Sequence, residues 1–216
     1  MEPMTNIALR AARKAGELIV RASDDLERIN VRAKNANDFV SDIDEQAEQE
    51  IIRHLRRAYP DHAVLGEESG RDGPADAEYL WVIDPLDGTT NFLRGIPHYA
   101  VSIACMHQGR LEHGVIVDPV RREEFTASRG RGAQLNGRRM RVSKLPGLEG
   151  ALLGTGIPFK GHQDQHLAPY AQSMAALAAQ CAGIRRAGAA SLDLAYVAAG
   201  RLDGFWELGL SIWGMA

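Results

Sequence analysis

Cysteine is scarce in this chain of 216 residues, in which Cys105 and Cys181 are the only two. Two cysteines cannot build the disulfide framework of a small secreted protein or a four-cysteine zinc site. Long uncharged apolar runs are also missing, because residues such as Arg10, Arg13 and Glu17 interrupt the N-terminal segment. We therefore expect no signal peptide and no membrane span, and the composition fits the reducing cytoplasm.

A strong net charge is absent as well, since 25 Lys and Arg residues face 28 Asp and Glu residues, for a net charge of −3. This mild balance requires neither nucleic acid nor a membrane as a partner. The hydrophobic content of 45% is enough for a chain of this length to bury a core. One or two domains are expected, and no internal repeat divides the chain.

Hydrophobic periodicity predicts an α+β N-terminal domain over 1–145 and an α/β subdomain over 146–216. The first contains two amphipathic helices and short β-prone runs whose connections are too short for crossovers, so they form an antiparallel meander. Loops are expected at 23–38 and 70–78, and Gly183 should cap the third helix. The expected helices are 5–22, 41–59, 167–181 and 191–199, and the expected strands are 63–65, 80–83, 99–106, 111–117, 123–127, 152–153, 184–186 and 204–206.

The stretch Trp81–Phe92 begins as a buried strand and ends in a polar turn that contains two carboxylates, Asp84 and Asp87. Pro85 fixes φ and lacks an N–H group, so we expect the strand to stop there. The turn offers oxygen ligands for a cation beside backbone donors for an anion, and a phosphate bound to Mg²⁺ needs both. A lone Asp-x-x-Asp would more often cap a helix, but the whole stretch favours the metal and phosphate interpretation.

Four acidic residues stand at strand ends or helix starts: Asp44, Glu67, Asp84 and Asp87. Buried carboxylates need partners, and carboxylates that converge need cations. Oxygen ligands without cysteine or clustered histidine favour Mg²⁺ or Mn²⁺ over zinc. Two such ions can clamp the attacking and leaving oxygens of a phosphoryl transfer, and either can lower the pKa of a bound water. Thr89 would orient that water, so no covalent nucleophile is required.

Residues 129–144 carry six basic side chains and no acid, around the strong hairpin signal Asn136-Gly137. A solvated hairpin face is the favoured interpretation, and a docking surface for nucleic acid or an acidic partner is the alternative. The interleaved aromatic residues of single-strand binders are missing. The basic residues are Arg129, Arg131, Arg138, Arg139, Arg141 and Lys144.

Two further patterns are weak signals for a ligand. His162 and His166 have the i, i+4 spacing of some zinc pairs, but no third ligand accompanies them. The run 154–160 contains glycines and a lysine without P-loop spacing, and Pro158 opposes a helix start there. Neither pattern is expected to bind a metal or a nucleotide.

The central stretch resembles the first signature of the inositol monophosphatase family, and further likenesses follow in the family's order. They extend from about Met4 to the last residue and are close to the bacterial inositol-1-monophosphatases. The similar segments are Asp38–Asp44 (the aspartate motif), Gly66–Ser69 (the Glu-Glu element), Asp84–Phe92 (the first signature), Arg186–Asp193 (the substrate-side loop and helix) and Gly204–Trp213 (the second signature).

The resemblance implies a layered α-β-α-β-α sandwich of the sugar-phosphatase type and lithium-sensitive hydrolysis of a phosphate monoester with two or three Mg²⁺ ions. The implied metal ligands are Glu67, Asp84, the Leu86 carbonyl and Asp87. Glu67 and Thr89 would activate the water, and Asp44 would support Thr89. The implied contacts to a phosphorylated polyol are Asp87, Gly88, Thr89, Ala190 and Glu207, with Lys34 near the active-site loop.

Two features depart from the family pattern. The second signature of the family ends in Trp-Asp, whereas this chain has Trp213-Gly214. Because that aspartate is a ligand of the second ion, we expect a weakened second metal site and impaired activity. The chain also ends at Ala216, where the family continues with a helix and strands, so we expect an incomplete C-terminal part with exposed apolar surface and a tendency to self-associate, which allows a homodimer.

Three functions stay open at this point. The first is a phosphoric monoester hydrolase acting on inositol-1-phosphate, which Glu207 and the loop 188–191 favour. The second is a phosphatase of fructose-1,6-bisphosphate or of a nucleotide 3′-phosphate, since these enzymes share the metal motif. The third is a non-catalytic role, in which the Arg-rich hairpin binds RNA or a transcription complex.

Overall fold

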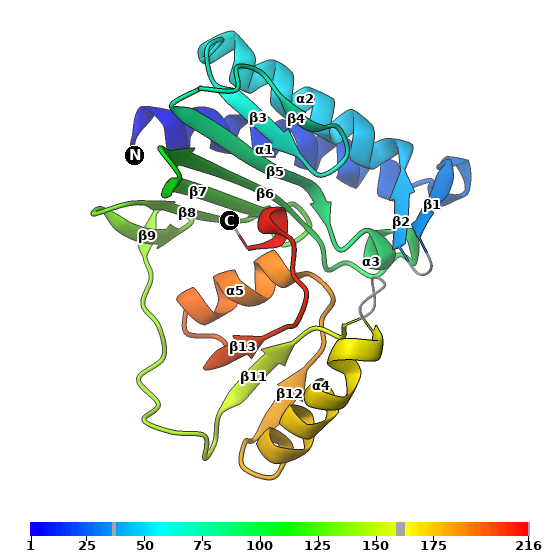
Figure 1. The fold of residues 1–216 in the computed structure, drawn as a ribbon, viewed down its shortest axis with the longest axis vertical. Helices are drawn as coiled ribbons and strands as arrows, with labels where there is room; N and C mark the ends of the chain where they lie inside the picture. Colours follow the sequence, from blue (N-terminus) through cyan, green and yellow to red (C-terminus); the bar gives the residue numbers. More distant parts are fainter. Residues whose placement is uncertain (36–37, 159–162, 216) are drawn as a thin grey trace.

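The computed structural model describes residues 1–35, 38–158 and 163–215, which form alternating layers of helix and sheet (Figure 1). Helices α1 (Pro3–Ser23) and α2 (Asp42–Ala58) cover one face of a large sheet, and α5 (Ala190–Ala198) lies against its other face. A three-stranded sheet follows beneath α5, and α4 (Gln163–Ala178) flanks it on the outside. This is the expected α-β-α-β-α order of layers.

The large sheet is mostly antiparallel, with β3 and β5 as its one parallel pair in the described part of the chain. Its strands, in spatial order, are β10 (Arg138–Arg139), β9 (Gly132–Leu135), β8 (Glu123–Ser128), β7 (Arg110–Asp118), β6 (Ala100–His107), β5 (Tyr79–Asp87), β3 (Ala63–Gly66) and β4 (Gly70–Asp72). The small sheet is parallel, in the order β12 (Gly183–Arg185), β11 (Leu152–Thr155) and β13 (Gly204–Trp206).

The main core lies between α1, α2 and the large sheet. Small residues on one face of α1, such as Ala11, Ala12 and Ala15, are fully buried and let the helix approach the sheet closely. Trp81 and Phe92 are the largest side chains with no exposed surface. A smaller cluster around Phe125 and Leu192 joins the large sheet to α5. The two clusters therefore hold the end of β5 between them.

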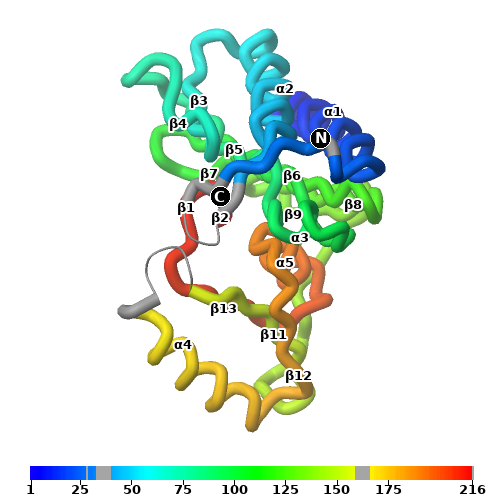
Figure 2. The backbone as a smooth tube through the Cα atoms, turned by 90° about the vertical axis from the view of Figure 1, so that its right-hand side faces the viewer, coloured from blue at the N-terminus to red at the C-terminus, as the bar shows by residue number. Residues whose placement is uncertain are grey.

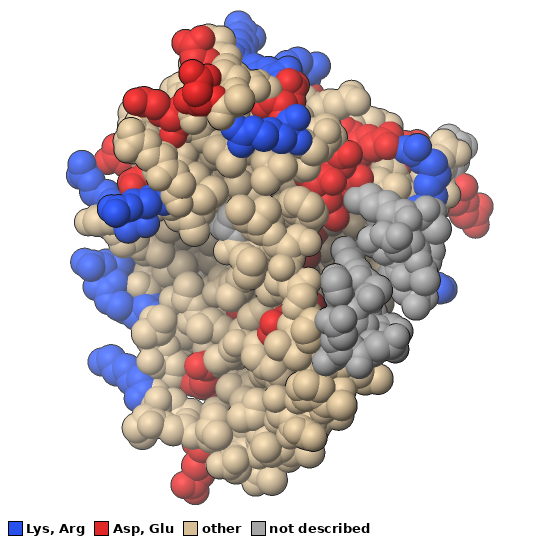
Figure 3. All heavy atoms as spheres, in the orientation of Figure 1, with Lys and Arg blue, Asp and Glu red and all other residues tan. Residues whose placement is uncertain are grey.

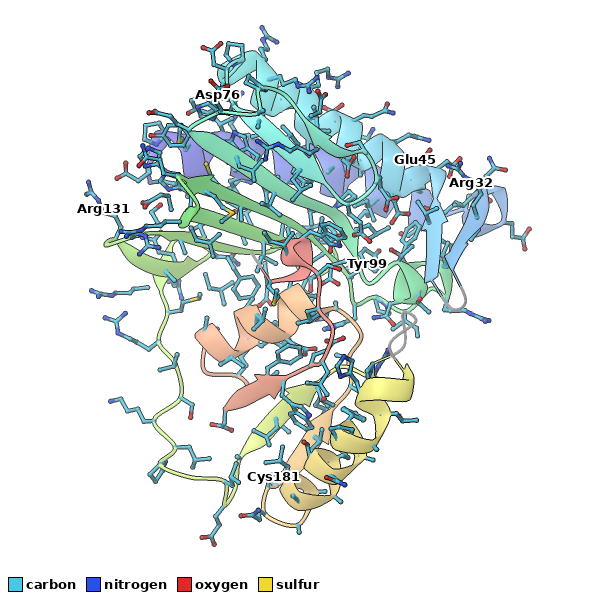
Figure 4. All side chains as sticks on the ribbon, viewed as in Figure 1. Arg32, Glu45, Asp76, Tyr99, Arg131 and Cys181 are labelled. Carbon is cyan, nitrogen blue, oxygen red and sulfur yellow. The ribbon has the colours of Figure 1, made fainter. Side chains whose placement is uncertain are left out.

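The polar segment 23–38 was expected to be a loop, and this prediction is wrong. It contains the short 3₁₀ helix η1 (Leu26–Arg28) and a two-stranded ribbon of β1 (Val31–Asn35) and β2 (Asp38–Ser41). The segment is polar and has no sustained apolar alternation, so the sequence pattern gave no strand signal. Figure 4 shows Arg32 of β1 directed at Glu45 of α2, and the two side chains form an ion pair.

The expectation that Pro85 ends the central strand is also wrong, because β5 continues to Asp87. The pairing with β6 shifts register between Asp84 and Asp87, so Pro85 and Leu86 lie in an irregularity of the ladder. Proline is tolerated there because no ladder hydrogen bond is required from it. The bulge places Asp87 beyond the regular sheet, where it faces α5.

Two expectations about smaller elements are wrong as well. The segment 70–78 was expected to be a loop, but β4 pairs with β3 in its first part. Helix α4 begins four residues earlier than expected and ends three residues earlier, and it contains Pro169. Gly183 belongs to β12 and does not cap a helix. The other predicted helices and strands are confirmed to within a few residues at their ends.

The short 3₁₀ helix η2 (Ile212–Gly214) brings the end of the chain back to β5 and β6, as Figure 2 shows from the side. Within the described residues, no helix combines the length and the apolar character that a membrane crossing requires. The position of η2 sets Gly214 beside the acidic end of β5.

Candidate active site

A cavity of about 520 Å³ lies where the end of β5, the start of α5 and the segment after β13 meet. It is lined by every residue that the sequence assigned to metal or substrate, except Asp44 and Lys34. Asp44 lies directly behind Thr89, and the side chain of Lys34 is outside the described part of the structure. The predicted residues on the wall are Glu67, Asp84, Leu86, Asp87, Gly88, Thr89, Ala190 and Glu207.

The turn after β5 depends on a glycine at position 88. Gly88 has a φ of +95°, a left-handed conformation that favours glycine. A Cβ atom there would also lie 3.0 Å from the His98 carbonyl oxygen and 3.2 Å from the Cβ of Tyr99, whose position Figure 4 labels. Gly88 precedes the five-residue helix α3 (Thr89–Leu93). This turn aims Thr89 back toward Asp44.

Asp44 is 2% exposed and is bonded by both Ser41 and Thr89. Its Oδ2 accepts the backbone N–H of Ser41 at 2.9 Å and the hydroxyl of Ser41 at 2.5 Å. Its Oδ1 lies 3.0 Å from Thr89 Oγ1, which is also 3.0 Å from the carbonyl oxygen of Leu86. Ser41 and Asp44 therefore form a capping box at the start of α2, and it fixes the carboxylate behind Thr89.

The turn that carries Glu67 is held by Glu48, a residue that the sequence analysis missed. Glu48 is 2% exposed, and its carboxylate accepts the backbone N–H groups of Glu68 and Ser69, each at 2.9 Å. A Cβ atom on Gly66 would lie 2.4–2.6 Å from that carboxylate, so only glycine fits between the two. The available signal was an acid four residues after Asp44 on the apolar face of α2.

Asp87 is hydrogen-bonded to Ser191 at the start of α5, 104 residues later in the sequence. Its Oδ2 accepts the N–H of Ser191 at 2.7 Å and the hydroxyl of Ser191 at 2.5 Å. Asn91 makes a second connection nearby, because its side-chain amide donates to the carbonyl oxygens of His98 and Ala187 at 2.8 and 2.9 Å. Ser191 and Asn91 lie in segments that resemble the family, but the sequence gave neither residue a role of its own, since both act through contacts between distant segments.

A further part of the cavity wall carries Glu207 and Asp193. A Cβ atom on Gly156 would lie 1.9–2.2 Å from the carboxyl group of Glu207, so the glycine makes room for this side chain. Burial first, and then the charges of Asp87 and Glu207, raise the pKa of Asp193 to about 7, against the opposing effect of Arg186. The glycines of the run 154–160, which did not fit a P-loop, therefore leave space for the side chains of this wall.

The carboxyl groups at the end of β5 repel one another. Burial, and then the charges of Glu67, Asp87 and Asp44, raise the pKa of Asp84 well above its ordinary value, and Asp84 is hydrogen-bonded to Glu67. Removal from water raises the pKa of Asp87 to about 6, although the bonds from Ser191 oppose the shift. Burial also raises the pKa of Asp44. A nearby cation would relieve this repulsion and favour the ionised forms.

The donor set around this acidic end fits Mg²⁺. All of its members are oxygen atoms, from Glu67, Asp84, Asp87 and the carbonyl of Leu86, and hard cations prefer oxygen. Within the described residues, no three His, Cys, Asp or Glu side chains are gathered tightly enough to define a metal cluster by position alone. The fit therefore depends on the donor chemistry, the shared cavity and the mutual repulsion of the carboxyl groups.

Gly214, which replaces the aspartate of the family signature, lines the same cavity next to Trp213. A Cβ atom there would meet only Leu210 Cδ2, at an ordinary contact distance of 3.7 Å. The site thus has room for a carboxylate that the chain does not supply. Of the possible zinc pair, His162 lies outside the described residues, so that pattern is not tested.

This layered fold, with an acid-lined cavity at the end of its central strand, is that of a phosphatase-type α/β protein. The model described as inositol monophosphatase family matches residues 1–216. The Nus factor SuhB of Pseudomonas aeruginosa is 64% identical over the whole chain, which covers 80% of that protein. The chain belongs to the inositol monophosphatase family.

Solved structures support the same assignment. The extragenic suppressor protein suhB from Bartonella henselae has a TM-score of 0.95 and 45% identity, and the match covers the whole chain and 82% of that protein. The inositol monophosphatase from Anabaena sp. PCC 7120 has a TM-score of 0.83 and 37% identity, over 97% of the chain and 76% of that protein. The predicted fold class is therefore confirmed.

Proposed function

We propose that the chain hydrolyses a phosphate monoester, with inositol-1-phosphate as the substrate, to a free polyol and inorganic phosphate. The observation that carries this proposal is a single cavity lined both by the three carboxylates Glu67, Asp84 and Asp87 and by Ala190 and Glu207. The three carboxylates would hold Mg²⁺, and the part of the cavity near Glu207 would hold the polyol. Family membership supports the reaction class.

Mg²⁺ bound at the acidic end would neutralise phosphate charge and lower the pKa of a bound water. The chain itself would position that water. Thr89 can donate its proton to Asp44 or Leu86, both 3.0 Å away, and its oxygen then accepts a hydrogen bond from the water. Glu67, which lines the same cavity, would take the proton of the water.

The polyol end is suited to hydroxyl groups. Glu207 and Asp193 present carboxyl oxygens that can accept hydrogen bonds from alcohols, and Arg186 lines the same cavity. A sugar or a ribose also carries hydroxyl groups, so fructose-1,6-bisphosphate and nucleotide 3′-phosphates are the alternative substrates. Glu207, held against Gly156, favours the compact inositol ring.

The test is phosphate release from inositol-1-phosphate as the Mg²⁺ concentration is raised, with and without lithium. The alternative substrates are measured in parallel. The matched variants are Glu67→Gln in the cavity and Glu78→Gln, outside it in the segment before β5. We expect Mg²⁺-dependent release that is lost in Glu67→Gln and kept in Glu78→Gln. Folded protein that hydrolyses none of these esters over the whole Mg²⁺ range would contradict the proposal.

We also infer a second role, binding of RNA or of a transcription complex through the basic hairpin. Relatives such as the Pseudomonas protein are named Nus factors, which points to partners of this class. Arg138, Arg139, Arg141 and Lys144 are exposed on β10 and the strap that follows it, and Figure 3 shows basic atoms along this edge. Arg129 and Arg131 form ion pairs with Glu112 and Glu2, which lowers their contribution.

Salt dependence separates this role from catalysis. Contacts to phosphates release counterions, so the affinity for RNA should fall steeply as salt is raised. We expect the double variant Arg138→Ala/Arg139→Ala to weaken binding and flatten this dependence, with phosphate release unchanged. The control is Arg53→Ala/Arg57→Ala, which removes the same charge from exposed positions of α2, outside the hairpin. Equal binding by both double variants would count against the hairpin as the docking surface.

A further inference from the structure

The connection between Asp87 and Ser191 lies at the junction of the two sheets. We propose that Ser191 is a positioning residue, whose hydroxyl fixes the Asp87 carboxylate so that Oδ2 is held by α5 and Oδ1 is left for a divalent cation. The inference deepens the proposed function and rests on it. If Ser191 has this role, the orientation of the Asp87 carboxylate depends on the position of α5.

The geometry of this contact is specific. Ser191 is 2% exposed, and both of its donors reach the same oxygen, at 2.5 Å from the hydroxyl and 2.7 Å from the backbone N–H. The N–H of Ala190 also bonds to this carboxylate. Two hydrogen bonds to one oxygen restrict rotation about the Cβ–Cγ bond of the aspartate. Asp87 is therefore held before any ligand arrives, which lowers the entropic cost of binding one.

The same pattern occurs at Asp44, where it is local. There, Ser41 donates its hydroxyl at 2.5 Å and its N–H at 2.9 Å to Oδ2, and Oδ1 faces Thr89. In both places one oxygen is fixed by a serine and the other is presented toward the site. Because the pattern at Asp44 orients a side chain for Thr89, the pattern at Asp87 is expected to orient one for a cation.

The contact also joins two parts of the molecule. The segments on either side of α5 have contacts of their own: Asn91 of α3 donates to the Ala187 carbonyl before the helix, and Arg201 after it forms a two-bond ion pair with Glu123 of β8. These contacts keep α5 in place when the hydroxyl of Ser191 is removed. The loss should therefore appear in metal binding rather than as general unfolding.

The experiment compares Ser191→Ala, Ser191→Thr and Ser173→Ala in the full chain. Ser173 is an exposed serine of α4 that bonds only its own helix, so it controls for the loss of a hydroxyl. Mn²⁺ binding is measured by calorimetry, because Mn²⁺ uses the same oxygen ligands and binds more tightly than Mg²⁺ does. We expect Ser191→Ala to weaken Mn²⁺ binding about 10-fold, as is usual when a partner of a ligand is lost. Ser191→Thr should restore most of it.

A second measurement needs no metal. If the hydroxyl acts on Asp87, the change in thermal midpoint caused by Ser191→Ala should shrink when Asp87 is already Asn. Wild-type affinity for Mn²⁺ in Ser191→Ala would overturn the role of Ser191. Wild-type protein that binds Mn²⁺ but releases no phosphate from any ester would contradict the proposed function alone. Wild-type protein that binds no Mn²⁺ would contradict both.

Discussion

The two sides of the cavity are built in different ways. On the side of α2 and β5, the acids are fixed by neighbours that are close in sequence or on adjacent elements: Ser41 holds Asp44, and Glu48 holds the turn of Glu67. On the side of α5 and η2, Asp87 depends on a serine 104 residues away, and position 214 supplies no side chain. The first side is thus rigid by itself, and the second is rigid only as far as α5 stays in place.

The largest effect is expected on the first side, from Asp84→Asn. Asp84 is 4% exposed, and a buried carboxyl among like charges costs stability. The variant should lose more than about 100-fold in phosphatase activity, because loss of a ligand exceeds loss of a partner of a ligand. It should also unfold at a higher temperature without metal. Activity kept within a few-fold would show that this side is not the metal site.

The next effect concerns the support of Glu67. Glu48→Ala should lower the free energy of unfolding by about 2 kcal/mol or more, because two buried N–H groups lose their acceptor. Urea unfolding measures this, with Glu50→Ala on the same helix as the control, since Glu50 makes an ion pair with the exposed Arg53. If the two variants lose the same free energy of unfolding, Glu48 does not make the side of α2 and β5 rigid.

A gain is expected on the second side, from Gly214→Asp. The Cβ atom has room there, so a carboxylate can reach the acidic end of β5. We expect about 10-fold higher activity at low Mg²⁺, or a correspondingly lower Mg²⁺ requirement, since one more ligand joins the site. Gly147→Asp adds the same charge on the strap and should change nothing. If activity does not rise, the second side is limited by something other than the missing ligand.

The smallest expected effect is a pH dependence of stability that arises from His62, a residue outside the cavity. The ring of His62 stacks between Tyr59 and Tyr79 and accepts a hydrogen bond from Trp81 at 3.0 Å. Burial lowers its pKa from the ordinary value of 6.5, so the unfolded chain binds the proton more readily. The stability contributed by neutral His62 is complete above pH 6.5 and declines as the pH falls below it.

Thermal unfolding between pH 7.5 and pH 5 tests this prediction. His62→Gln keeps an acceptor for Trp81 but does not titrate, so its stability should fall less over this range than that of the wild type. His107→Gln, at the far end of the stack, is the matched change. An equal decline in all three proteins would remove His62 as the cause.

Local sequence patterns predicted most of the helices and strands. The apolar stripes of α1 and α2, the Asn136-Gly137 turn and the β-prone runs of the meander each depend on neighbours within a few residues, and each was predicted. The ribbon of β1 and β2 was missed because its short strands have no sustained apolar alternation. Pro85 was misjudged because a shift of register in β5 removes the need for its N–H group.

The site shows the same division. Glu67, Asp84 and Asp87 stand at the ends of elements that the sequence predicts, so their approach to one cavity could be expected. Glu48 was missed because a glutamate on a helix normally faces water, and only the tertiary structure shows that it turns inward to Ser69. Ser191 was missed because a single serine carries no pattern, and its importance comes from a distant partner.

The close contact between Gly66 and Glu48 makes these two positions an epistatic pair. Any side chain at position 66 would occupy the space that the Glu48 carboxylate fills, so the larger residue becomes tolerable only after position 48 is shortened. A shortened residue 48, in turn, would leave the N–H groups of Glu68 and Ser69 without their acceptor. Neither position can therefore be redesigned alone, and the effects of changes at the two will not add.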